Sequence, residues 1–290
     1  MKDEFTRQWI IEKSLSIIER YALGILTLRG LHYQLVSIGM TNTLQHYKRV
    51  VAAMTQARWD GSISFETFSD LDREMVGETK WEETILENKI TRGKEQIGLW
   101  MKNYNKNRWE NQDNYVEVFI EKKALQGVFQ GPCEQLSVGL GACKGYPSLT
   151  FLNDTSERFG WAINDRKNPI ILYFGDYDPS GEDIPRSIGD NLYRMHCNVE
   201  VRRIALMEDQ VVEWGLPPAP VKVGDTRSNT WTGIGQVELD AVKPEQLQKM
   251  VTEAIEDCFD YDVHDDLMDQ EAAERKEYII ALKEFVTSIE

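Results

Sequence analysis

Two aspartates separated by one residue, Asp176 and Asp178, are the strongest chemical signal in the sequence. They follow the continuous apolar run 169–174, which is typical of a strand buried on both faces of a parallel sheet. Ligands of such sheets bind at the carboxyl ends of the strands, and carboxylate oxygens suit Mg²⁺. The pair therefore favours a metal site, although a solvated turn has the same pattern.

A third carboxylate, Glu121, closes the earlier β-rich run 115–121. If both runs are strands of one parallel sheet, Glu121 converges with Asp176 and Asp178 at one edge. Three unpaired carboxylates repel one another, and a divalent cation relieves that repulsion. The three residues together predict a site for Mg²⁺, or for Mn²⁺ in its place.

The elements that would position these carboxylates alternate between strand and helix. Apolar runs predict strands at 115–121, 136–143, 169–174 and 199–206. Helical patterns at 124–135, 146–162, 184–195, 244–259 and 262–288 separate or follow them. This order predicts an α/β fold with a parallel sheet.

The first third of the chain has a different pattern. Helices are expected at 3–22, from Thr27 to Gly39, and after residue 42, with a short strand at 62–65. That order is typical of a winged helix, and equally of other small helical domains. In the third helix the apolar stripe is expected at Leu44, Tyr47, Val51 and Met54, with Lys48 and Arg49 on other faces.

Composition and charge narrow the possible functions. The chain has 290 residues and a net charge of −15, but residues 1–120 carry only −1 and residues 121–290 carry −14. A nucleic-acid partner would therefore bind the first part, with Lys48 and Arg49 as the first candidates. No run approaches the about 20 apolar residues of a membrane span. The start of the chain shows no secretory signal and the four cysteines form no CxxC pair, so a reducing cytoplasm is expected.

An ordered set of motifs points to a known family. After Glu121 come Lys-Gly-Tyr-Pro at 144–147, Asp-Tyr-Asp-Pro-Ser-Gly at 176–181, and Val-Glu-Leu-Asp-Ala at 237–241. Over about residues 115–258 the chain resembles a Toprim domain. Within that fold it resembles the A subunit of topoisomerase VI and its relative, the meiotic double-strand-break protein. The resemblance implies domains at 1–76 (winged helix), 77–113 (helical connector) and 114–290 (Toprim with C-terminal helices).

The same family carries a catalytic tyrosine a few residues after an arginine in its winged helix. Residues 28–33 read Leu-Arg-Gly-Leu-His-Tyr, so the resemblance places Tyr33 at the nucleophile position and Arg29 beside it. Arg29 and Tyr33 are four residues apart and share one side of a helix. Tyr33 lies nearly opposite the apolar stripe that contains Leu31 and Leu35, so the core of this helix does not require it. A surface or interface tyrosine would have the same pattern.

The function implied by the resemblance is metal-dependent cleavage of double-stranded DNA by transesterification. Tyr33 would attack a backbone phosphate, Arg29 would stabilise charge, and Glu121, Asp176 and Asp178 would hold Mg²⁺. A homodimer is implied. The relatives use a separate ATPase subunit, and because this chain has no nucleotide-binding motif, any energy coupling would have to come from a partner of that kind. The alternatives are a hydrolytic Toprim nuclease, in which water attacks, and a non-catalytic DNA-binding module.

Overall fold

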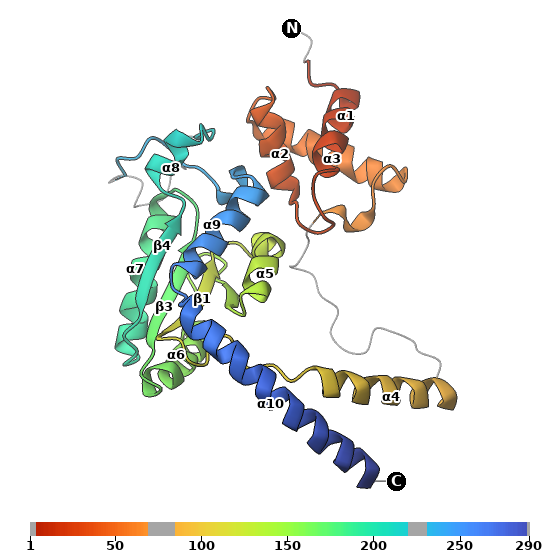
Figure 1. Cartoon of the computed structure of the whole chain (residues 1–290). Helices are drawn as coiled ribbons and strands as arrows, with labels where there is room; N and C mark the ends of the chain where they lie inside the picture. Colours follow the sequence, from red (N-terminus) through yellow and green to blue (C-terminus); the bar gives the residue numbers. More distant parts are fainter. Residues whose placement is uncertain (1–3, 69–84, 220–230, 289–290) are drawn as a thin grey trace. The chain divides into compact units, whose positions relative to one another are not determined.

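A computed structural model describes residues 4–68, 85–219 and 231–288 of the chain (Figure 1). Contacts group the chain into two compact units. The first combines Met1–Arg73 with Asn114–Cys258, and the second combines Glu74–Asp113 with Phe259–Glu290. This grouping differs from the predicted ranges 1–76, 77–113 and 114–290 in two ways: the first range groups with most of the third, and the last helix groups with the connector. The winged-helix and Toprim assignments stay predictions.

Three helices form the first part of unit 1: α1 (Arg7–Ile18), α2 (Leu28–Ser37) and α3 (Leu44–Trp59). Each begins after a threonine whose hydroxyl accepts a hydrogen bond from a backbone N–H of the first turn. These threonines are Thr6, Thr27 and Thr43. Such caps satisfy N–H groups that have no partner within the helix, so the sequence itself fixes where the three helices begin.

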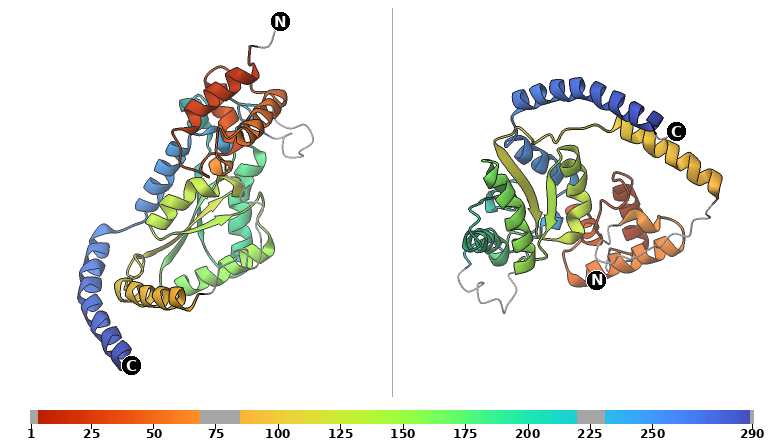
Figure 2. Two further views of the ribbon diagram at one scale, coloured as in Figure 1. Left: turned by 90° about the vertical axis from the view of Figure 1, so that its right-hand side faces the viewer. Right: turned by 90° about the horizontal axis from the view of Figure 1, so that it is seen from below.

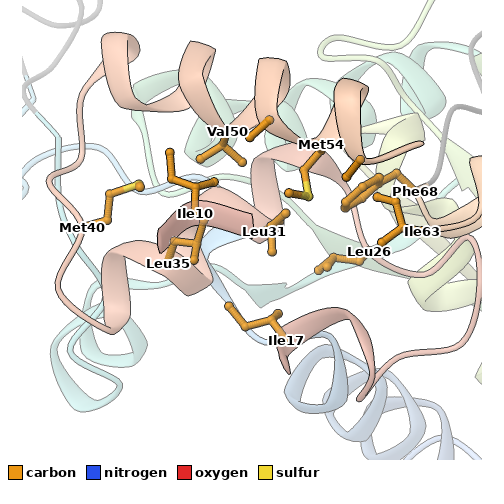
Figure 3. Packing of buried hydrophobic residues seen from close by; sticks show 12 residues of the cluster. Ile10, Ile17, Leu26, Leu31, Leu35, Met40, Val50, Met54, Ile63 and Phe68 are labelled. Atoms are coloured by element: carbon orange, nitrogen blue, oxygen red, sulfur yellow. The ribbon is translucent and has the colours of Figure 1, made fainter. Parts of the chain in front are cut away.

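The core of this helical part is a cluster of aliphatic side chains. Figure 3 shows Ile10, Leu31, Leu35, Val50 and Met54 gathered between the three helices. The predicted stripe of α3 is therefore only partly right. Met54 is buried, but Leu44 is 66% exposed because it is the first residue of the helix and precedes the packed turns. Small residues of the following turns, Ala53 and Ala57, complete the buried face instead.

The short strand predicted at 62–65 is wrong. Residues 62–64 form a turn that leads into a 3₁₀ helix, η1 (Phe65–Thr67). Phe65 is exposed and its ring lies edge-on against Trp59. The strand-like pairing that is present joins Leu26 and Phe68 in a single parallel bridge. Residues 69–84, which include the end of the predicted winged helix, lie outside the described residues.

The second part of unit 1 contains a four-stranded parallel sheet. Its strands are β1 (Asn114–Ile120), β2 (Gly139–Ala142), β3 (Asn168–Phe174) and β4 (Glu200–Ala205), in the order β2-β1-β3-β4. Every neighbouring pair runs parallel. The predicted α/β fold with a parallel sheet is thus confirmed, and the two central strands are those that end beside Glu121 and Asp176.

Helices cover both faces of this sheet (Figure 2). On one face α6 (Leu149–Asn164) packs against β3 and α7 (Pro179–Arg194) packs against β4, with Phe159 and Ile188 in the shared core. On the other face, α5 (Gln126–Gln135) packs against α9 (Pro244–Glu256), and Phe129 of α5 contacts Phe174 of β3. Unit 1 also contains three short helices: η2 (Lys123–Leu125), α8 (Glu208–Glu213) and η4 (Leu239–Ala241).

Unit 2 contains α4 (Leu86–Lys102) and the long α10 (Tyr261–Ser288). Residues that follow α4 fasten it to α10. Gln112 and Asp260 exchange two hydrogen bonds of 2.7 Å, and the ring of Trp109 lies edge-on against Phe259. In the described part of the chain, no helix has the length and apolar character that crossing a membrane requires.

Candidate functional site: an acidic cleft at the sheet edge

The three predicted carboxylates follow two strands that pair directly. Ile120 of β1 lies opposite Phe174 of β3, so Glu121 and the segment after Phe174 leave the sheet together. An oxygen of Glu121 accepts a hydrogen bond of 2.9 Å from the backbone N–H of Asp176. Glu121, Asp176 and Asp178 all line one cleft of ≈ 890 Å³. The structure therefore brings together the three residues that the sequence selected.

Asp178 also has a structural task. It is the N-cap of α7, and its Oδ1 accepts a hydrogen bond of 2.7 Å from the backbone N–H of Gly181. Pro179 then occupies the first turn, where its missing N–H costs nothing. The second carboxylate oxygen of Asp178 is not part of that cap, so capping and a role in the cleft are compatible.

The Lys-Gly-Tyr-Pro segment at 144–147 forms another wall of the cleft. The N–H of Gly145 donates to the carbonyl of Glu121 over 3.2 Å, and this attaches the segment to the end of β1. The hydroxyl of Tyr146 donates to Asp183 of α7 over 2.7 Å. Lys144, Gly145 and Tyr146 all line the cleft. Two of the quoted motifs thus meet at one place.

A lysine occupies the acidic centre of the cleft. The Nζ of Lys122 lies 2.9 Å from Asp176, 3.2 Å from Glu238 and 3.2 Å from Asp240. Sequence reasoning assigned no role to Lys122, Glu238 or Asp240. The available signals were the position of Lys122 directly after Glu121 and the presence of Glu238 and Asp240 in the motif at 237–241. The site therefore contains five carboxylates rather than three.

The pKa values of the buried groups reflect this crowding. Burial raises the pKa of Glu121, and it raises that of Asp176 to about 7, with Lys122 acting in the opposite direction. Burial by itself lowers the pKa of Lys122, but the charges of Asp176, Asp240 and Glu238 outweigh this effect and raise it. Negative charge is thus costly here, and a further cation would stabilise it.

The donor set has the chemistry of a magnesium site, since its oxygens are hard carboxylate ligands. Their arrangement, however, centres on an ammonium group. Within residues 4–68, 85–219 and 231–288, no group of three or more His, Cys, Asp or Glu side chains is arranged around a position for a metal ion. The residues present fit Mg²⁺ by donor type and by their shared cleft, with Lys122 beside three of the carboxylates.

Helix α2 is joined to the same cleft. The Thr27 hydroxyl donates to Asp240 over 2.9 Å and accepts from the N–H of Gly30 over 2.8 Å. Arg29 lines the cleft and its Nε lies 3.0 Å from an oxygen of Glu238. Arg29 therefore reaches the carboxylate cleft of its own chain.

Tyr33 lies on α2 but is not among the residues that line the cleft. As predicted, it lies outside the aliphatic cluster of the helical part. Tyr33 is nevertheless buried, since it is only 8% exposed. The reason is that a second face of α2 packs against η4. Burial, followed by the charge of Glu238, raises the pKa of Tyr33 to about 12, while Arg29 acts in the opposite direction.

The two predicted DNA-binding residues have different surroundings. Lys48 is exposed on α3, as a phosphate contact requires. Arg49 is half-buried, and its guanidinium donates a hydrogen bond to the backbone carbonyl of Phe5. Arg49 therefore contributes to holding the segment before α1 against α3, and Lys48 is the better candidate for a DNA contact.

Comparisons with known proteins give no relative for this chain: no family model, no curated protein and no solved structure matches it. The class of this protein is therefore defined by its fold and its candidate site alone. The chain is an α/β protein with a four-stranded parallel sheet and an acidic cleft at the carboxyl ends of its central strands.

Proposed function

We propose that this chain cleaves double-stranded DNA in a metal-dependent reaction of the topoisomerase VI A-subunit type, with a winged helix and a Toprim domain. The observation that carries the proposal is the convergence of Glu121, Asp176 and Asp178, chosen from separate stretches of sequence, in one cleft. A cleft of this kind, at the strand ends of a parallel sheet, is a usual place for a ligand. Arg29 reaches the same cleft from α2.

The roles of the residues follow from their positions. Glu121, Asp176 and Asp178 would hold Mg²⁺, which supplies positive charge to the phosphate that is attacked. Arg29 and Lys144 are two of the cations that line the cleft, and they would attract the DNA backbone to it. Tyr33 would attack the phosphorus atom and form a phosphotyrosyl bond, and the departing deoxyribose oxygen would take up a proton.

Tyr33 must lose its phenolic proton in that reaction. Its raised pKa makes this loss unfavourable in the isolated chain, and Arg29 is the neighbour whose charge helps. A homodimer, in which the tyrosine of one protomer serves the carboxylates of the other, follows from the resemblance. It agrees with the absence of Tyr33 from the residues that line its own cleft. The separate ATPase subunit rests on the resemblance alone.

The buried position of Tyr33 favours a second candidate, hydrolysis of DNA by water at the same carboxylates. In that reaction Tyr33 is a packing residue, and no covalent intermediate forms. Both candidates require the carboxylates, and only the first requires the phenol.

Metal binding is the first test. Millimolar Mg²⁺ or Mn²⁺ should raise the melting temperature of the wild-type chain, because a ligand that binds only the folded state stabilises it. Asp178→Asn is the sharpest variant, since its amide oxygen can still cap α7 while the charge is lost. We expect this variant to melt near the wild-type temperature without metal and to lose most of the metal effect. If neither Mg²⁺ nor Mn²⁺ changes the melting temperature of the wild-type chain, the proposed metal site is contradicted.

DNA cleavage separates the two candidates. End-labelled duplex DNA is incubated with the chain and Mn²⁺, the reaction is denatured, and label that migrates with protein is measured. Transesterification predicts a covalent adduct in the wild type and none in Tyr33→Phe, which still binds metal. Equal cleavage by both proteins without an adduct would assign the reaction to water.

DNA binding has its own variant. Lys48→Gln should weaken binding to duplexes of any sequence and reduce the steepness of the salt dependence by about one unit of slope. Lys249, exposed on α9, provides a matched control in Lys249→Gln. Equal effects of the two substitutions would contradict the assignment of DNA binding to the helical part.

A further inference from the structure

The ammonium group of Lys122 lies against three of the five carboxylates of the cleft. Its three carboxylate neighbours come from two distant segments, the end of β3 and the 238–240 turn. The side chain of Asp240 is 3% exposed and that of Asp176 is 9% exposed. The ammonium of Lys122 is partly exposed, but it is held strongly, because it replaces the hydration that the buried Asp176 and Asp240 have lost.

In this geometry Lys122 and a bound divalent cation would compete for the same carboxylate. Asp176 is a proposed ligand of Mg²⁺ and is also the nearest partner of Lys122, at 2.9 Å. Two cations that share one carboxylate repel each other strongly inside a protein, where the effective dielectric constant is lower than in water. Full metal binding and the observed position of Lys122 are therefore mutually unfavourable.

We infer that Lys122 is a tethered counterion that competes with the divalent metal for Asp176 and thereby sets the metal affinity of the cleft. The inference rests on the proposed function, because it concerns the same metal site. In the metal-free chain Lys122 neutralises the acidic centre and holds Glu238 and Asp240 next to β3. When metal binds, Lys122 leaves Asp176 and stays within reach of Glu238 and Asp240.

Other cations of the cleft allow a matched control. Lys144 lines the same cleft but belongs to the segment after β2. Lys144→Met removes one positive charge from the cleft, so it measures the general effect of charge on metal binding. Lys122→Met removes the same charge and keeps the length of the aliphatic chain. Lys122→Arg keeps the charge, and its bulkier guanidinium tests whether a cation at this position is enough to compete.

The measurement is calorimetric titration of the metal-free chain with Mn²⁺ alone and with Mg²⁺ alone. We expect Lys122→Met to bind either ion about tenfold or more tightly than the wild type. Lys144→Met should show a smaller gain, and Lys122→Arg should resemble the wild type. Without metal, Lys122→Met should melt at a lower temperature than the wild type, and added metal should recover the difference.

Each other result has a definite meaning. If the wild type binds metal and Lys122→Met binds it with the same affinity, Lys122 is not a competitor, while the metal site stands. If Lys144→Met tightens binding as much as Lys122→Met does, the effect is general and the inference is wrong. If neither the wild type nor Lys122→Met binds metal, the metal site of the proposed function fails and the inference fails with it.

A second measurement needs no variant, so it remains informative if Lys122→Met does not fold. The wild-type chain is treated briefly with an amine-acylating reagent, and modification of each lysine is followed by mass spectrometry. Lys122 should react slowly without metal, because its amine is paired with three carboxylates, and faster with saturating Mn²⁺. Lys249, on the surface of α9, serves as the reference. Unchanged or slower modification of Lys122 with metal would overturn the inference.

Discussion

The ionisation of Tyr33 can be measured without any DNA, and the structure predicts the result. Burial and the charge of Glu238 raise the pKa of this phenol to about 12, against the opposing charge of Arg29. A solvated tyrosine has a pKa near 10. At pH 11, therefore, about 10% of Tyr33 should be ionised, compared with about 90% of a solvated phenol. At pH 8 the same comparison is about one in 10,000 against about one in 100.

The assay is a difference titration. The chain has 11 tyrosines, so the ultraviolet absorbance of tyrosinate is recorded for the wild type and for Tyr33→Phe, and the difference isolates one phenol. Circular dichroism at each pH checks that both proteins stay folded. Glu238→Gln should move the midpoint to lower pH, and Arg29→Met should move it higher. A difference titration that is complete by pH 11 would refute the conclusion that α2 buries this phenol against η4.

Two further predictions concern the stability of unit 1, and urea unfolding measures both. Gly127→Ala should lower the free energy of unfolding by about 1–3 kcal/mol, because a Cβ would lie 2.6 Å from the carbonyl oxygen of Gly24; Gly131→Ala on the same helix meets nothing within 4 Å and should not destabilise. Arg158→Met should lower the free energy of unfolding by an amount near the lower end of about 3–5 kcal/mol, because the arginine is partly exposed. The substitution leaves the carboxylate of Glu117 buried without the two hydrogen bonds of 2.7 and 2.9 Å that Arg158 donates. A variant of either kind with wild-type stability would show that the contact is not formed in solution.

The strands of the sheet could be predicted because each is encoded by a short, continuous stretch of sequence. The run 169–174 is apolar at successive positions, and β3 is indeed buried on both faces through Phe174. The helix predicted at 184–195 is α7, but it begins earlier than predicted, at Pro179, directly after its capping residue Asp178. The convergence of Glu121 with Asp176 then followed from the geometry of parallel strands, without knowledge of any distant contact.

The part of the site that sequence reasoning missed depends on distant contacts. Lys122 and Glu238 are 116 positions apart, and nothing in either segment indicates that they meet. The burial of Tyr33 is of the same kind. The pattern of α2 identified the stripe of Leu31 and Leu35, but a helix packed on two faces carries a second contact surface that periodicity does not reveal. In α3, alanines took the place of the larger residues expected on the buried face.

The Thr27 hydroxyl makes the first turn of α2 a reporter of charge in the cleft. A hydroxyl has one proton, and here that proton goes to Asp240 while the oxygen receives the N–H of Gly30. Donation to a carboxylate polarises the oxygen and strengthens its capacity as an acceptor. Neutralising Asp240 would therefore weaken the cap, and hydrogen exchange of the Gly30 amide would accelerate. The exchange rate of the Gly30 amide, in the first turn of the helix that carries Arg29 and Tyr33, thus reports the charge of Asp240 in the cleft.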